Sequence, residues 1–76
     1  MHIHIKLYGD LKKYALDGLS QFSMTIPQGS TLADIYEWLA IPDDLHTSLI
    51  NGRRAEHTSH LEENDIIVLM PPIAGG

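Results

Sequence analysis

The segment Ile66-Ile67-Val68-Leu69-Met70 is the most strand-like stretch of the 76-residue sequence and lies close to its end. Its aliphatic side chains favour extended backbone, and every position is apolar. A strand with two apolar faces is either central in a sheet or has one face covered by another segment. We therefore expect the rest of the chain to build a sheet around residues 66–70.

Two strands are predicted before the middle of the chain. Apolar and polar residues alternate over residues 2–8, which is typical of a half-buried strand. Asp10 follows and is suited to cap a short helical stretch over residues 11–16. A second alternation, over residues 22–26, stops at Pro27. The two strands would form a hairpin with an elaborate connection.

One amphipathic helix is predicted after the second strand. Ser30 and Thr31 are both suitable N-caps, and Pro42 would end the helix, because the residue before proline is displaced from helical dihedrals. A helix of about ten residues is marginal alone, so it must pack on the sheet. Its apolar stripe consists of Leu32, Ile35, Tyr36 and Leu39.

The second half of the chain predicts three more strand segments. Residues 45–50 form the first, Asn51-Gly52 is a tight hairpin turn, and residues 53–56 return as a short strand. The turn Glu63-Asn64-Asp65 leads into the last strand. The predicted fold class is α+β, a single domain over residues 1–76 with roughly four to five strands and one main helix that packs on their sheet.

Composition excludes several classes of protein. With 43% hydrophobic and 20% charged residues, the chain is too apolar to be disordered, and it has no apolar run that could span a bilayer. The absence of cysteine excludes disulfides, thiolate zinc sites and a thiol nucleophile. A formal net charge of −5 argues against nucleic acid and suits docking on a basic protein surface. The N-terminus does not resemble a targeting segment, so we expect a cytoplasmic protein.

The sequence closes with Pro71-Pro72-Ile73-Ala74-Gly75-Gly76. The prolines stiffen the exit from the sheet, and the last residues have almost no side chain. Extended over roughly 20 Å, such a tail could reach a buried catalytic centre in another protein. A carboxylate with no Cβ beside it is open to attack from either side. We expect residues 71–76 to be a flexible tail whose reactive group is the Gly76 carboxylate.

The strand order together with this tail resembles the MoaD/ThiS-type sulphur carrier family, which has the ubiquitin-like β-grasp fold. The resemblance implies that the sheet is mixed. The resemblance covers the whole chain, and the ending is most similar to the small subunit of molybdopterin synthase. At the turn before the last strand, Asn64 stands where the family usually has glycine. Five segments carry the resemblance: Ile5-Lys6-Leu7-Tyr8-Gly9-Asp10-Leu11-Lys12-Lys13-Tyr14, Ser30-Thr31-Leu32, Ile50-Asn51-Gly52, Glu63-Asn64-Asp65 and Pro71-Pro72-Ile73-Ala74-Gly75-Gly76.

The resemblance implies a carrier that is not itself an enzyme and binds no cofactor. An adenylating enzyme of the ubiquitin-activating type would use ATP to activate the Gly76 carboxylate, and a sulphur donor would displace AMP to leave a thiocarboxylate. Residues 71–75 would enter the partner's active site. An acceptor such as the molybdopterin synthase large subunit would then use the sulphur to build the dithiolene of molybdopterin.

A docking patch is predicted on the last strand. If the helix packs on one face of this strand, Ile66, Val68 and Met70 point outward from the other, since strand side chains alternate. We expect these three residues to bind partners, because a tail needs an adjacent anchor to be delivered accurately. In the alternative interpretation, the patch packs under a loop formed by residues 57–64.

Histidines and arginines offer weaker signals. His2 and His4 share one strand face, and His57 and His60 lie near each other in a loop, but no further ligand completes a metal site. We expect solvated histidines and no metal. Arg53-Arg54 either contacts acidic groups of a partner or is a pair of solvated charges beside a turn.

Two other functions stay open on the sequence. The protein could be a ubiquitin-like modifier joined to lysines through Gly76, or an interaction module in which removal of Gly75 and Gly76 has no effect. Among sulphur carriers, thiamine, tungsten-cofactor and other sulphur pathways are alternatives to molybdopterin. The sequence does not name the acceptor, the sulphur donor or the oligomeric state.

Overall fold

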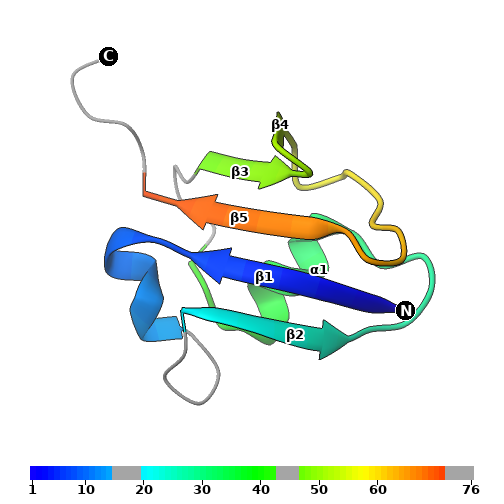
Figure 1. The fold of residues 1–76 in the computed structure, drawn as a ribbon, viewed down its shortest axis with the longest axis horizontal. Helices are drawn as coiled ribbons and strands as arrows, with labels where there is room; N and C mark the ends of the chain where they lie inside the picture. Colours follow the sequence, from blue (N-terminus) through cyan, green and yellow to red (C-terminus); the bar gives the residue numbers. More distant parts are fainter. Residues whose placement is uncertain (15–19, 43–46, 72–76) are drawn as a thin grey trace.

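The structure is a computed structural model that describes residues 1–14, 20–42 and 47–71. These residues form a sheet, a 3₁₀ helix and an α-helix (Figure 1). None of the helices in the described ranges is long and apolar enough to cross a membrane. In chain order the elements are β1 (His2–Leu7), η1 (Gly9–Tyr14), β2 (Gln21–Thr25), α1 (Leu32–Trp38), β3 (Thr47–Ile50), β4 (Arg53–Arg54) and β5 (Ile66–Met70).

The five strands form one mixed sheet in the order β2-β1-β5-β3-β4. β5 pairs parallel with β1 and antiparallel with β3, so the last strand is central, which is one of the two alternatives that its two apolar faces allow. β1 and β2 form the expected antiparallel hairpin. The predicted class, α+β with a mixed sheet on one main helix, is confirmed.

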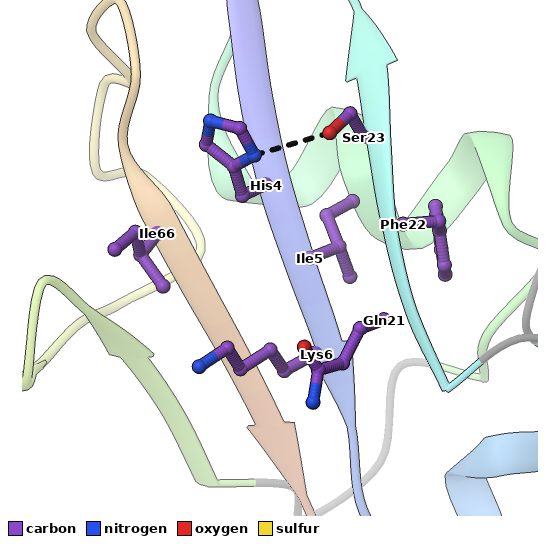
Figure 2. A pocket seen from close by; sticks show the side chains of 7 residues that line it. All are labelled: His4, Ile5, Lys6, Gln21, Phe22, Ser23 and Ile66. Atoms are coloured by element: carbon purple, nitrogen blue, oxygen red, sulfur yellow. Dashed lines mark hydrogen bonds between the residues drawn. The ribbon is translucent and has the colours of Figure 1, made fainter.

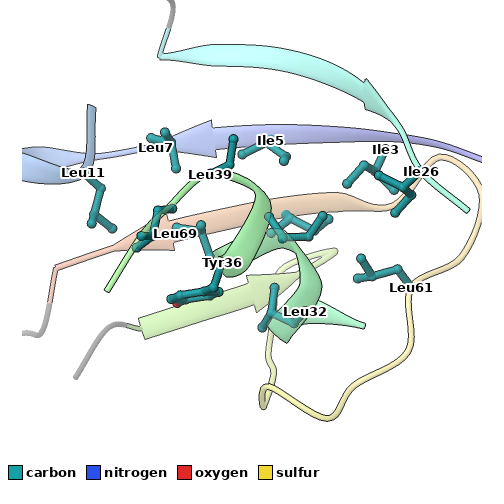
Figure 3. Packing of buried hydrophobic residues seen from close by; sticks show 13 residues of the cluster. Ile3, Ile5, Leu7, Leu11, Ile26, Leu32, Tyr36, Leu39, Leu61 and Leu69 are labelled. Atoms are coloured by element: carbon teal, nitrogen blue, oxygen red, sulfur yellow. The ribbon is translucent and has the colours of Figure 1, made fainter. Parts of the chain in front are cut away.

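The hydrophobic core lies between α1 and one face of the sheet (Figure 3). The Tyr36 hydroxyl of α1 makes a buried hydrogen bond of 2.6 Å with the Ser48 hydroxyl of β3, which ties helix and sheet together without an unpaired polar group. The core residues share near-complete burial: Ile3, Ile5, Leu7, Leu11, Ile26, Leu32, Ile35, Tyr36, Leu39, Ile41, Leu61, Ile67 and Leu69.

The start of α1 is held by the segment 57–64. Thr31 is the N-cap, and the N–H groups of Leu32 and Ala33 donate to carbonyl oxygens of this segment, each at 3.0 Å. The first N–H groups of a helix have no partner within it, so these bonds satisfy donors that would otherwise be unpaired. Leu61 from the same segment is buried in the core (Figure 3). Residues 57–64 therefore pack on the helix side of the sheet.

α1 has seven residues, fewer than the predicted ten, because it ends at Trp38, four residues before Pro42. Ala40 adopts a φ of 57°. Its N–H donates to the Glu37 carbonyl at 3.1 Å, and the N–H of Ile41 donates to the Tyr36 carbonyl at 2.9 Å. This pair of bonds is the Schellman C-cap, which requires one residue in the left-handed region and normally uses glycine there.

Two turns place asparagine in the left-handed region. At the β3–β4 turn, φ is 53° at Asn51 and 83° at Gly52, as predicted for a tight hairpin. The Asn51 side chain accepts a hydrogen bond from the Ile66 N–H at 3.0 Å and donates to Asp65 Oδ1 at 2.9 Å, so it also fixes the start of β5. Asn64 has a φ of 66°, which explains why a glycine would also suit this position.

Other predicted segments are observed over part of their range. The helical stretch expected over residues 11–16 is a 3₁₀ helix that begins at Gly9, and residues 15 and 16 lie outside the described ranges. The strand expected over residues 45–50 is observed from Thr47, with residues 45 and 46 outside the described ranges. β4 has two residues, shorter than the predicted segment 53–56.

Candidate functional site

The tail begins at the C-terminal end of β5, and its first residue, Pro71, is partly buried. Because β1 and β5 are parallel, their C-terminal ends lie side by side, and η1 packs at the same end of the sheet (Figure 1). The tail therefore leaves the sheet beside the loop that joins β1 to η1. The other predicted tail residues lie outside the described ranges: Pro72, Ile73, Ala74, Gly75 and Gly76.

Gly9 is the first residue of η1, directly after this loop, and lies against Pro71. Its φ is +58°, and a Cβ at this position would lie 2.6 Å from Cγ and 3.1 Å from Cδ of Pro71. Carbon atoms do not pack at 2.6 Å, so a side chain here would displace the proline. The N–H of Tyr8 donates to the Leu69 carbonyl at 3.0 Å and fixes the loop to β5. Gly9 thus sets the path on which the chain leaves β5.

The predicted docking residues Ile66, Val68 and Met70 point away from the core, on the side of the sheet that we call the outer face. Ile66 is 42% exposed and the other two are partly buried, whereas the two residues between them are fully buried. The segment 57–64 packs against the start of α1, on the opposite side of the sheet, so the alternative in which it covers this patch is wrong. The docking role of the three residues stays a prediction.

β3 extends the outer face beside β5. Leu49 pairs with Val68 and is partly buried, and Thr47 pairs with Met70. Paired residues on neighbouring strands project from the same face. Leu49 therefore enlarges the apolar patch, which sequence reasoning placed on β5 alone.

An open depression of about 410 Å³ lies on the outer face, next to the patch (Figure 2). Its polar lining comes from His4 and Lys6 of β1 and from Gln21 and Ser23 of β2, and Ile66 borders it. His4 Nδ1 lies 3.1 Å from Ser23 Oγ. Within the described part of the chain His4 forms no ion pair with a carboxylate, so this Ser–His pair lacks the third group that orients a catalytic base.

His2 and His57 are engaged with neighbours. The His2 backbone N–H donates to Glu63 Oε2 at 2.6 Å, and His2 Nδ1 lies 3.3 Å from the same oxygen. That backbone hydrogen bond is the main reason that the pKa of Glu63 lies below its ordinary value of 4.5, and the nearby positive charges add to it. The His57 ring packs 4.6 Å from the Tyr36 ring. Across the described ranges, no three metal-ligating side chains come together.

Residues 5–76 match the model of the ThiS family, a range that includes the end of β1, the central strand β5 and the whole tail. The chain belongs to the ThiS family. The resemblance to MoaD/ThiS-type carriers is thereby confirmed at the level of the family. No curated protein matches the sequence.

Solved structures with the same fold as this ThiS-family chain include a modifier and two molybdopterin-converting factors. Small archaeal modifier protein 1 from Haloferax volcanii has a TM-score of 0.79 at 23% identity, with 100% of both chains covered. A putative molybdopterin converting factor subunit 1 from Pyrococcus furiosus has a TM-score of 0.79 at 17% identity, covering 95% of this chain and 98% of that one. A complex of subunits 1 and 2 of molybdopterin-converting factor from Helicobacter pylori gives 0.67 at 19% identity, with 100% of both chains covered. These likenesses show the ubiquitin-like β-grasp fold.

Sequence reasoning missed two features of this ThiS-family site. Gly9 was interpreted only as part of a resemblance segment, and its contact with Pro71 depends on a parallel strand pair that no local pattern reveals. Leu49 was part of a predicted strand, but only the register with β5 places it beside Val68.

Proposed function

We propose that this protein is a sulphur carrier whose Gly76 carboxylate is adenylated and then converted to a thiocarboxylate. The acceptor that we favour is the large subunit of molybdopterin synthase, with this chain as the non-catalytic small subunit. The observation that carries the proposal is the ThiS-family match, which extends through Gly75 and Gly76. The apolar patch on the strand that leads into the tail supports it.

The chemistry needs little from the carrier. Attack of the Gly76 carboxylate on the α-phosphorus of ATP forms an acyl-adenylate and releases pyrophosphate. A sulphur nucleophile then forms a C–S bond at the carbonyl carbon, and AMP departs with the electrons of the C–O bond. The mechanism requires a free carboxylate at Gly76 and an unbranched approach, which Gly75-Gly76 provides. Catalytic groups would come from the activating enzyme, and ATP would bind there.

Intact-mass spectrometry tests the proposal directly. The protein is incubated with an activating enzyme of the ubiquitin-activating type, ATP and sulphide. We expect the mass to increase by the difference between sulphur and oxygen. The matched control is a variant that lacks Gly76, which keeps the fold and the patch but moves the carboxylate by one residue. If the wild-type mass does not change while the same enzyme converts its own known carrier, the carrier function is contradicted.

Two acceptors can be separated with the thiocarboxylated protein. Sulphur transfer to a pterin precursor in the presence of the molybdopterin synthase large subunit would support the favoured pathway. Transfer only in the presence of a thiazole synthase would move the protein to thiamine synthesis. The likeness to a molybdopterin-converting factor complex favours the first outcome, and the ThiS-family match is compatible with both.

Ubiquitin-like modification of lysines is the second candidate. The likeness to small archaeal modifier protein 1, which spans both chains completely, favours it. Both functions begin with adenylation of Gly76, so the protein could serve either. Lysines that carry a C-terminal fragment of this chain after proteolysis of cell protein would support conjugation, and these adducts should disappear in cells whose only copy lacks Gly76. After trypsin the fragment would begin at Ala55, because Arg54 is the last basic residue of the sequence.

A further inference from the structure

Strand register places four outward residues, from β1, β5, β3 and β4, in one row, and the neutral Gln21 of β2 lies beyond it, paired with Lys6. Lys6 of β1 pairs with Val68 of β5. Val68 also pairs with Leu49 of β3, and Leu49 pairs with Arg54 of β4. Paired residues project from the same face. The row on the outer face therefore has two apolar side chains in its centre and one cation at each end.

The cation at the β1 end lies close over the apolar centre. Figure 2 shows the Lys6 side chain extending from β1 across β5, on the side of the sheet where His4 and Ile66 lie. Lys6 is partly buried and Arg54 is exposed. Neither forms an ion pair within the described part of the chain. Both ammonium and guanidinium groups are thus available to charges on another molecule.

Carboxylates are absent from all five strands of the described sheet, although the chain has a formal net charge of −5. The charged residues of the strands are the cations Lys6, Arg53 and Arg54. The acidic charge of the described chain lies elsewhere, in η1, in α1 and in the loops. These carboxylates belong to Asp10, Asp34, Glu37, Glu56, Glu62, Glu63 and Asp65.

We propose that the outer face docks on a protein surface with an apolar centre and a carboxylate on each side, one facing Lys6 and one facing Arg54. The occupant is the activating enzyme, so the inference rests on the proposed function. The patch lies on β5, which continues directly into the tail, and a surface that holds β5 also positions the start of the tail at Pro71. The net charge of −5 predicted a basic partner, but the charged residues on this face of the sheet are cations and call for an acidic one.

Charge complementarity also argues against a second copy of this chain on the same face. Two outer faces in contact would bring the cations of one row toward those of the other without a carboxylate between them, and like charges in an interface are unfavourable. An apolar centre supplies affinity, while charges at its rim mainly raise the association rate and select the partner.

The test compares two charge-reversed proteins. In the first, Lys6→Glu and Arg54→Glu reverse the ends of the row. In the matched control, Lys12→Glu and Lys13→Glu make the same change in net charge on η1, where both side chains are exposed. Association with the purified activating enzyme is followed by stopped flow at low and high salt, after circular dichroism has shown that each variant is folded.

We expect the Lys6/Arg54 variant to associate about tenfold more slowly than wild type at low salt, with the difference shrinking at high salt. The η1 variant should stay close to wild type. The docking proposal is overturned if wild type and both variants associate at equal rates, or if both variants lose the same fraction of the rate. The carrier function still stands in that case if the thiocarboxylate forms. Wild-type protein that neither binds the enzyme nor is adenylated would overturn the proposed function as well. A concentration-dependent dimer in sedimentation that Val68→Asp abolishes would assign the face to a second copy instead.

Discussion

Replacement of Gly9 by alanine tests whether the contact with Pro71 matters to the fold. The new Cβ would lie 2.6 Å from Pro71 Cγ, and ordinary carbon contacts begin near 3.4 Å, so the proline or the loop must move. The N–H of Tyr8 holds the loop to the Leu69 carbonyl at 3.0 Å, which limits movement on that side. We therefore expect Pro71 and the start of the tail to be displaced.

Two contributions set the size of the effect. An alanine in the left-handed region costs roughly 1–2 kcal/mol, offset by about 0.4–1 kcal/mol from the lower entropy of the unfolded chain. Overpacking adds roughly 1–3 kcal/mol. The free energy of unfolding of Gly9→Ala should fall by about 1–5 kcal/mol, and each kcal/mol lowers the Tm of a domain of this size by roughly 4–8 °C.

The chain provides its own controls for backbone strain. Gly29 and Gly52 also have positive φ, 84° and 83°, but a Cβ at either position meets nothing within 4 Å. Their φ values lie farther from the left-handed minimum near +57° than the +58° of Gly9. Backbone strain alone would therefore make Gly29→Ala and Gly52→Ala at least as destabilising as Gly9→Ala.

Urea unfolding followed by circular dichroism, at matched temperature and pH, measures all three variants. A fourth protein combines Gly9→Ala with Pro71→Ala, which removes the proline Cγ and Cδ and leaves Cβ at 4.0 Å, an ordinary contact. We expect this second change to recover at least about 1 kcal/mol, as coupled neighbours do. The reasoning is refuted if Gly9→Ala is no worse than the two controls, or if the proline change recovers nothing.

The remaining predictions concern a helix end and a surface carboxylate. Ala40→Gly should raise the free energy of unfolding by about 0.5–1 kcal/mol, because glycine adopts the φ of 57° without the penalty of a Cβ. This gain exceeds the loss caused by the added entropy of the unfolded chain, and a lower urea midpoint would contradict the prediction. The lowered pKa of Glu63 means that the ionised carboxylate favours the fold, so its contribution is complete above pH 4.5 and is lost as the pH falls through the lower pKa of the folded state. Glu63→Gln should therefore be less stable than wild type near neutral pH. The two proteins should be equally stable in acid, where Glu63 is protonated and no longer accepts the His2 hydrogen bond as an anion. A difference in the free energy of unfolding that does not change with pH would count against this assignment.

Patterns that depend on neighbours in the sequence predicted much of the fold. The alternation over residues 2–8, the apolar run over residues 66–70 and the Asn51-Gly52 turn each rest on local rules, and the structure confirms all three. The uninterrupted apolar run left two alternatives, a central strand or a strand with one face covered by another segment, and the structure shows the first. The mixed sheet came from the family resemblance, and the order of the strands within it, β2-β1-β5-β3-β4, was not predicted.

Features set by contacts far apart in the sequence could not be predicted in this way. The helix ends early because Ala40 accepts a strained φ, although alanine is normally the strongest helix former. The chain tolerates this strain because the core buries Ile41 to 5% exposure directly after it. In the candidate site, Gly9 meets Pro71 and Lys6 lies beside Val68 only because β1 and β5 are parallel neighbours.

β5 gives the site a property that decides how its function should be tested. Its inward residues Ile67 and Leu69 have no solvent exposure, so truncation of either side chain lowers the free energy of unfolding by roughly 2–5 kcal/mol. Its outward residues Ile66 and Val68 contribute less to the core and lie on the proposed docking face. A loss of partner binding after truncation at an inward position would therefore report unfolding, whereas the same loss at an outward position in a folded protein reports recognition. Because burial alternates along β5, adjacent residues test the two effects. Comparison of partner binding by Val68→Ala and by Ile67→Ala therefore shows how far docking depends on the outer face and how far it depends on the stability of the fold.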